Sequence, residues 1–187
     1  MKRLFKRLII PLSAIDTALP DKGVIVDLGC GEGIISKKLS QNSKRKILGI
    51  DMDKNKIARA KKNARSNEKY RVGNIISIFL PKKISGFVIA DVLHHLSRVD
   101  QKKVLARMIK HIERKGMILI KEINAHDVIR SKLSRIWDYL YYPQDQINYL
   151  SSTEITEYME KAGFKVKHTK KRLFTPTSVH VFVCTKL

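Results

Sequence analysis

The stretch VIVDLGCGEG, residues 24–33, decides the fold of this chain. It opens with a short apolar run typical of a buried strand and continues into three glycines within five positions. A glycine turn after such a strand lets the backbone approach a ligand where any Cβ would collide, and a following helix presents unpaired N–H groups. The pattern therefore predicts a nucleotide-cofactor site at the carboxyl end of the strand, although a tight connection without a ligand would use the same residues.

Apolar strands alternate with helices along most of the chain. After the strand at 23–29, the pattern predicts strands at 46–51, 70–75, 86–91 and 116–123, and helices at 33–41, 53–64 and 98–112. Strands joined through helices form a mostly parallel sheet that is covered on both faces. A last helix at 152–163 precedes two runs with period two, 164–169 and 178–185, which predict an antiparallel pair. The expected fold class is α/β, doubly wound, with a C-terminal antiparallel hairpin.

Composition limits the classes of function. With 187 residues, of which 43% are apolar, the chain is expected to form one globular domain. No run of about 18 apolar residues is present, so no membrane span is expected. The two cysteines, Cys30 and Cys184, provide neither a disulfide framework nor a zinc site, which favours a reducing cytoplasm and no metal. The formal charge of +21 indicates either an anionic partner or a Lys-rich, well-solvated surface.

A carboxylate follows the second predicted strand. Asp51 ends the run LGID about twenty residues after the glycine turn, where a carboxylate can accept both hydroxyls of a ribose. Asp53 is the better candidate for the cap of the next helix. The glycine spacing GCGEG departs from the GxGxxG of dinucleotide enzymes, and Glu32 would repel a pyrophosphate at the helix N-terminus. A nicotinamide cofactor is therefore disfavoured.

Taken in order, these segments resemble the motifs of the class I S-adenosylmethionine-dependent methyltransferases, and above all their small single-domain members. VIVDLGCGEG resembles the first motif, ILGIDMD the second, VGNI the third and FVIADVLHHL the fourth, and KGMILIKEI resembles the region of the fifth strand. The resemblance extends over residues 20–187 and implies a seven-stranded sheet that the C-terminal hairpin closes. It implies one domain over 1–187, with an N-terminal helical segment at 1–19 and an acceptor-covering insertion at 124–150.

The resemblance also implies the cofactor, S-adenosylmethionine, and its product, S-adenosylhomocysteine. Residues of the first motif would surround the methionine part of the cofactor: Asp27, Gly29, Cys30, Gly31 and Gly33. Asp51 would hold the ribose hydroxyls, and Met52 would lie against the adenine.

The third and fourth motifs would complete the cofactor site. Asn74 and Ile75 would lie at the adenine edge; the family often has Asp at the first of these positions, and an amide oxygen can still accept from the adenine amino group. Ala90 and Asp91 would end the fourth strand beside the sulfonium, where a carboxylate offsets the ammonium of the methionine.

Methyl transfer from a sulfonium is an in-line displacement, so the protein mainly positions the reactants. A hydroxyl, phenol or ammonium acceptor also needs a base. The candidates are His94 and His95, directly after the fourth motif, and Glu122 at the end of the fifth strand. Sequence does not separate the two histidines, and each has the alternative of a satisfied histidine that starts a loop. The alternative for Glu122 is a helix cap or an acid that supports another residue.

Aromatic residues crowd the segment that would cover the acceptor: Trp137, Tyr139, Tyr141, Tyr142 and Tyr149. They form either an apolar or cation-binding lid, with Tyr139, Tyr141 and Tyr142 as the candidates for substrate binding, or a helix face packed on the sheet. The fourth motif reads ADVL, which is unlike the [N/D]PP[Y/F] of enzymes that methylate adenine or glutamine amide nitrogens. A small-molecule or lipid-like acceptor is therefore the first expectation.

Two alternatives stay open. The charge suggests an RNA methyltransferase, since ribose 2′-O enzymes use a Lys-Asp-Lys-Glu set of which Asp91 and Lys121 could supply half. Against this, the basic residues are scattered over several helices and no appended RNA-binding module is visible. The other alternative is a non-catalytic cofactor-binding or scaffold domain, which the intact glycine turn and Asp51 disfavour.

The first ten residues, MKRLFKRLII, form a basic amphipathic pattern when they are wound as a helix. Such a helix either lies on an anionic membrane surface or packs its apolar side over the cofactor pocket. The expected location is the cytoplasm, with peripheral contact at the inner membrane surface under the first interpretation.

Overall fold

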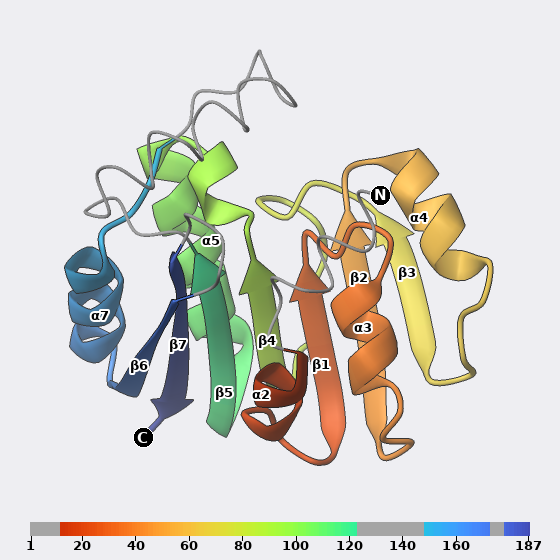
Figure 1. Ribbon diagram of the computed structural model, residues 1–187, viewed down its shortest axis with the longest axis horizontal. Coiled ribbons are helices and arrows are strands. Elements are labelled where there is room, and N and C mark those ends of the chain that lie inside the picture. Colours follow the sequence, from red (N-terminus) through yellow and green to blue (C-terminus); the bar gives the residue numbers. More distant parts are fainter. Residues whose placement is uncertain (1–11, 123–147, 173–177) are drawn as a thin grey trace.

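Seven strands of the described chain form one sheet in the order β3-β2-β1-β4-β5-β7-β6 (Figure 1). The structure, a computed structural model, describes residues 12–122, 148–172 and 178–187. Five parallel strands come first: β1 (Gly23–Leu28), β2 (Arg45–Asp51), β3 (Glu68–Val72), β4 (Ile84–Ala90) and β5 (Ile112–Glu122). β6 (Phe164–Arg172) and β7 (Ser178–Lys186) run antiparallel to each other, and β7 is antiparallel to β5. The expected doubly wound sheet with a C-terminal hairpin is confirmed.

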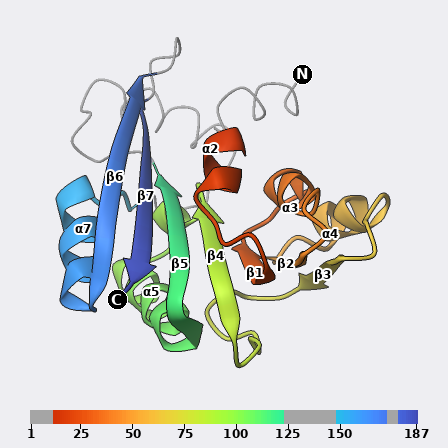
Figure 2. The same ribbon diagram turned by 90° about the horizontal axis from the view of Figure 1, so that it is seen from below.

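Helices cover both faces of this sheet (Figure 2). α2 (Leu12–Thr17) and α3 (Ile34–Leu39) lie on one face, α5 (Arg98–His111) and α7 (Ser152–Lys161) lie on the other, and α4 (Lys54–Lys61) packs beside β3. Each face buries an apolar cluster, with Ile15 and Leu39 in the first and Met108 and Met159 in the second. Burial on both faces explains why a central strand such as β4 is almost continuously apolar.

Side-chain caps fix where three helices begin. Asp53 accepts hydrogen bonds from two backbone N–H groups in the first turn of α4. Ser97 accepts from the N–H of Asp100 at the start of α5, and Ser151 forms a reciprocal capping box with Glu154 at the start of α7. These starts therefore follow from local sequence, as expected for α4 and α5 and for one of the two serines before α7.

The strand order reverses between β1 and β4. The chain runs outward from β1 through β2 to β3 and then places β4 on the other side of β1. Ligands of open α/β sheets bind at the carboxyl ends of the strands beside such a reversal. The glycine turn after β1, Asp51 at the end of β2 and Asp91 after β4 all lie at that end of the sheet.

Several expected segments lie outside the described residues. They include the basic amphipathic residues 1–10 and all of the insertion at 124–150 except residues 148–150. Of the helical segment expected at 1–19, the structure describes the part that contains α2. None of the helices that the structure describes combines the length and the apolar character needed to cross a bilayer.

Candidate active site

The glycine turn after β1 has a backbone shape that glycine adopts far more readily than other residues. Gly29 and Gly31 have φ angles of 73° and 54°, both in the left-handed region. A Cβ on Gly29 would lie 2.3 Å from Cγ2 of Val92, whereas a Cβ on Gly31 would meet no atom of the described residues within 4 Å. Gly31 thus borders space at the carboxyl end of β1 that no described residue fills, as a ligand-binding turn requires.

The carboxylate of Asp51 is oriented by the backbone that faces it. Its Oδ2 accepts the N–H of Gly31 at 2.8 Å, and its Oδ1 accepts the N–H of Asp53 at 2.9 Å. The N–H of Gly29 donates to the carbonyl of Ile50 at 2.8 Å, which joins the turn to the same strand end. A carboxylate oxygen has two lone pairs, so each oxygen of Asp51 keeps one acceptor position for a ribose hydroxyl.

Asp27 lies at the base of the turn and ties β1 to α3. It is 2% exposed, and its Oδ2 accepts both the hydroxyl and the backbone N–H of Ser36, at 2.6 and 3.2 Å. Burial raises the pKa of Asp27 from 3.8 to about 6, although the hydrogen bonds from Ser36 lower it. Asp27 therefore supports the turn from inside the protein.

Replacing Asp27 by Asn keeps an oxygen for Ser36 and removes the ionisation. Because folding raises this pKa, the fold favours the neutral acid, and the stability that this group contributes is lost as the pH rises from 3.8 through about 6. The difference in unfolding free energy between Asp27→Asn and the wild type should therefore shift by about 3 kcal/mol in favour of the variant as the pH rises from about 4 to about 8. Urea unfolding of both proteins measures this gain, and a difference that is constant with pH would contradict it.

The three residues expected at the adenine, and Cys30 of the first motif, have different surroundings. Met52 is 67% exposed, which leaves its side chain available to a flat ring. The side-chain oxygen of Asn74 accepts the N–H of Ile76 at 2.8 Å and shapes the turn after β3. The side chain of Ile75 is buried in the core, and that of Cys30 packs beneath α4, where burial raises the pKa of its thiol. Ile75 and Cys30 therefore offer a cofactor their backbones rather than their side chains.

An ion pair joins the carboxyl ends of β4 and β5. The ammonium of Lys121 lies 2.6 Å from Oδ1 of Asp91; the lysine side chain is 1% exposed and the aspartate side chain 36%. Asp91 has a φ of 56°, which is uncommon for a residue other than glycine, and its N–H donates to the carbonyl of Lys121. Ala90, just before it, is half-buried. The carboxylate expected to offset the ammonium of the cofactor is thus already balanced by a cation of the protein.

Glu122 holds the turn after β4, which contains the short 3₁₀ helix η1 (Leu93–His95). Its Oε1 accepts the N–H groups of Val92 and Leu93 at 3.0 and 2.8 Å, and its Oε2 lies 2.6 Å from Nδ1 of His94. Glu122 and His94 are 3% and 4% exposed. Both oxygens of this carboxylate are therefore engaged in fixing the turn.

The two adjacent histidines have different environments. The ring of His94 is enclosed between Glu122 and Tyr149, whose ring stacks on it with the centroids 5.4 Å apart. His95 is half-buried, and its ring centroid lies 4.1 Å from that of His94. Tyr149 is itself buried, so this aromatic residue of the insertion is a packing residue, whereas Tyr139, Tyr141 and Tyr142 lie outside the described residues.

Sequence reasoning missed one polar side chain that supports the site. The amide of Gln101, which is 1% exposed, donates to the carbonyl of Leu93 at 2.9 Å and to that of Asn148 at 2.6 Å. It thereby ties α5 to η1 and to the end of the insertion. The available signal was a polar residue three positions before Val104 on the buried side of a helix, where a polar group needs a partner.

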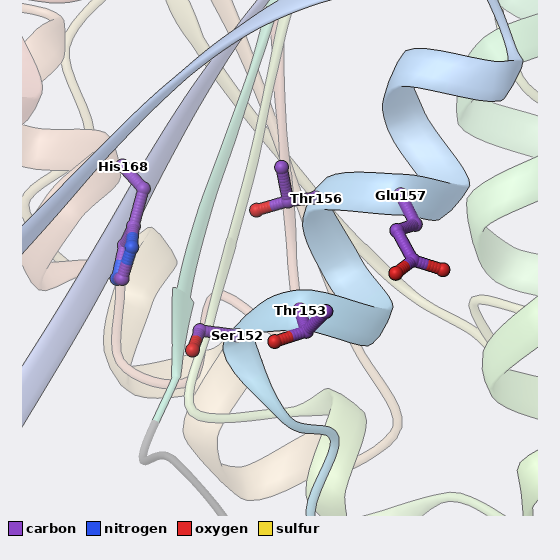
Figure 3. A pocket seen from close by; sticks show the side chains of 5 residues that line it. All are labelled: Ser152, Thr153, Thr156, Glu157 and His168. Atoms are coloured by element: carbon purple, nitrogen blue, oxygen red, sulfur yellow. The ribbon is translucent and has the colours of Figure 1, made fainter.

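A separate hollow lies between the start of α7 and β6 (Figure 3). It is lined by Ser152, Thr153, Thr156, Glu157 and His168. Because β6 and the β3–β2 pair are at opposite edges of the sheet, this hollow is distinct from the glycine turn and Asp51.

A sheet of this strand order, with a glycine turn after β1 and an acid at the end of β2, defines the fold of the class I S-adenosylmethionine-dependent methyltransferases. The chain belongs to the methyltransferase domain family, because the family model described as "Methyltransferase domain" matches residues 1–169. S-adenosylmethionine is the cofactor of this domain, and the oriented carboxylate of Asp51 and the space above Gly31, which no described residue fills, fit it.

Relatives and solved structures agree with this assignment. The chain is 32% identical over 108 residues to ribosomal protein L11 methyltransferase of Photobacterium profundum, a match that covers 56% of this chain and 36% of that protein. The matches to the curated relatives span between 22% and 36% of the length of those proteins. The fold is similar to magnesium protoporphyrin IX methyltransferase (ChlM) of Synechocystis PCC 6803 with bound SAH, with a TM-score of 0.74 at 15% identity over 94% of this chain and 82% of that one. It is also similar to the YcgJ protein of Bacillus subtilis, with a TM-score of 0.75 at 12% identity over 94% and 97% of the two chains.

Proposed function

We propose that this chain transfers the methyl group of S-adenosylmethionine to a small-molecule or lipid-like acceptor. The observation that carries the methyl-donor part of the proposal is the carboxylate of Asp51, which the N–H groups of Gly31 and Asp53 orient beside space that no described residue fills. A site that is oriented before binding loses less entropy when the ribose arrives.

The proposed cofactor contacts follow the ends of the strands. The first motif holds the methionine part mainly through its backbone: Asp27, Gly29, Cys30, Gly31 and Gly33. Asp51 binds the ribose hydroxyls, and Met52 with the turn at Asn74 and Ile75 borders the adenine. Ala90 and Asp91 border the reacting end, where Lys121 keeps the Asp91 carboxylate in place. When bound, the cofactor supplies a methyl group activated by its sulfonium.

We assign the base to His95 and positioning roles to His94 and Glu122. A hydroxyl or phenol acceptor must lose a proton as its oxygen attacks the methyl carbon, and an imidazole can take that proton near neutral pH. His94 is enclosed and bound to Glu122, whose two oxygens already accept three hydrogen bonds. His95 is the more exposed of the two histidines, which supports its assignment.

The acceptor would be covered by the insertion at 124–150, where Tyr139, Tyr141 and Tyr142 offer aromatic surface. The proposal includes contact of residues 1–10 with an anionic membrane if the acceptor is a lipid, because their basic amphipathic pattern suits such a surface. The ADVL sequence of the fourth motif supports an acceptor other than an adenine or amide nitrogen.

Transfer of label from methyl-labelled S-adenosylmethionine tests the proposed acceptor. A cell extract is separated into RNA, protein, lipid and small-molecule fractions, and each is incubated with the chain and the labelled cofactor. We expect label in the lipid or small-molecule fraction, and we expect Tyr141→Ala to raise the KM for that acceptor while the Kd of the cofactor stays unchanged. Label confined to protein would instead favour an acceptor like the one in the name of the L11 methyltransferases.

A second candidate acceptor is a ribose hydroxyl of RNA, which the Lys121–Asp91 pair favours. The ammonium of Lys121 and the carboxylate of Asp91 lie 2.6 Å apart at the ends of β5 and β4. They correspond to one Lys and the Asp of the Lys-Asp-Lys-Glu set used by ribose 2′-O enzymes. Label confined to the RNA fraction would establish this candidate and exclude the first.

A further inference from the structure

The basic residues are less scattered than the sequence suggested. Residues 44–71 contain eleven Lys and Arg but only three Asp and Glu, so this stretch carries much of the positive charge of the chain. In the structure it forms strand β2, helix α4 and the edge strand β3, which stand together at one end of the molecule (Figure 1).

Part of this charge lies on lysines of helix α4 that no acidic side chain of the described residues neutralises. Arg59 on one side of the helix pairs with Glu32 at 2.8 Å. Lys54 and Lys61 are seven residues apart and therefore share the other side, and Lys62 follows at the C-terminal cap. All three lysines are exposed, and none of them forms an ion pair within the parts of the chain that the structure describes.

Strand β3 places further basic side chains on the other face of the sheet. Tyr70 packs against α4, and Glu68 lies on the same face of the sheet, where it accepts a hydrogen bond from the Tyr70 hydroxyl; both side chains are buried. Side chains alternate along a strand, so Lys69 and Arg71 point to the opposite face, and both are exposed. They too have no ion-pair partner among the described residues. β3 is an edge strand, so its outer side pairs with no other strand that the structure describes.

We propose that these five side chains form a basic ridge that binds the phosphate backbone of a nucleic-acid strand: Lys54, Lys61, Lys62, Lys69 and Arg71. The ridge places cations on both sides of a sheet edge, and a flexible polyanion can follow both sides at once. A bilayer presents one plane and would meet only one side. Lys and Arg contacts to phosphates, with release of the condensed counterions, supply most of the affinity in such complexes.

Protection of an edge strand accounts for only part of the ridge. Charged side chains on an edge strand discourage pairing with another sheet, which explains Lys69 and Arg71 but not the lysines of α4. The ridge also reaches the cofactor end of the sheet, since Lys54 follows Asp53 and Arg71 precedes Val72 at the end of β3. A strand bound there would approach the methyl-transfer site, but the inference does not depend on which acceptor is methylated.

Fluorescence anisotropy of a labelled single-stranded RNA of about 20 nucleotides tests the ridge on the full chain. The ridge variant replaces Lys61, Lys62 and Lys69 by Gln. A control variant with the same net charge replaces three exposed lysines outside the ridge by Gln: Lys102 on α5, and Lys165 and Lys167 on β6 at the opposite edge of the sheet. Binding is measured at several salt concentrations, and S-adenosylhomocysteine affinity and thermal unfolding report the integrity of each variant.

We expect the ridge variant to bind the RNA at least about tenfold more weakly at moderate salt, and its salt dependence to fall by about 2 in log–log slope, because each lost phosphate contact removes about 0.7. The control variant should stay near wild type, and both variants should keep their cofactor affinity. Equal losses in the two variants would overturn the proposal, since charge alone would then explain binding. If the ridge variant loses binding to vesicles that contain phosphatidylserine but binds RNA like the wild type, the ridge binds a lipid surface and the proposal is overturned.

Discussion

Asp51→Ala should weaken the binding of S-adenosylhomocysteine by roughly a hundredfold. Two ribose hydroxyls lose a charged acceptor, and each such hydrogen bond contributes about 1.5 kcal/mol or more, so about 3 kcal/mol is lost in total. The expected size of the effect depends on the orientation of the carboxylate by the N–H groups of Gly31 and Asp53. Isothermal titration calorimetry measures the change.

Two further variants separate the ribose contact from support of the turn. Asp51→Asn keeps one acceptor oxygen and should lose less affinity than Asp51→Ala. Asp53→Ala removes the side-chain cap of α4 at a residue two positions after Asp51. It should lower thermal stability while the cofactor affinity stays near that of the wild type. If Asp51→Ala is folded and binds within about threefold of wild type, the assignment of the second motif is wrong.

Glu122→Ala should cost about 3–5 kcal/mol of unfolding free energy. The substitution leaves the N–H groups of Val92 and Leu93 and the ring of His94 without their acceptor in a buried setting, and each unsatisfied group costs about 1–3 kcal/mol. The turn after β4 would loosen, and the positions of Asp91 and His95 depend on that turn. We therefore expect kcat to fall together with stability.

Glu122→Gln is the matched control for this prediction. Its amide oxygen can still accept the two backbone N–H groups, and its NH₂ group can donate to His94, so the loss of stability should be less than half of that of Glu122→Ala. Partial recovery of kcat in the Gln variant would confirm a positioning role. If both variants are as stable as wild type and equally inactive, Glu122 is the base and our assignment of roles is wrong.

Much of the fold could be predicted from the sequence because it depends on local patterns. Continuous apolar runs mark strands buried on both faces, and the caps Asp53, Ser97 and Ser151 mark where helices start. The strand at 116–123 was predicted too short: β5 already begins at Ile112, where α5 ends without an intervening loop. Ile112 is both the C-terminal cap of α5 and the first residue of β5, so no turn residue such as Gly or Pro marks this boundary.

The site was harder to predict, because a motif mixes residues that face a ligand with residues that face the core. Cys30 and Ile75 belong to the first and third motifs, yet both side chains are packed inside the protein. His94 and His95 have the same chemistry in sequence, and only the 3₁₀ turn decides which ring meets Glu122. The sequence suggests Asp91 and Lys121 as members of one catalytic set, but their direct ion pair connects residues thirty positions apart and depends on the neighbouring ends of β4 and β5.

A crystal structure of the chain with S-adenosylhomocysteine tests the central claim most directly. We predict that both ribose hydroxyls lie within hydrogen-bond distance of the Asp51 carboxylate, that the adenine lies against Met52, and that the amino-acid end follows the glycine turn toward Asp91. The account would be contradicted by a ligand bound elsewhere, for example in the hollow at His168, with the space above Gly31 left empty.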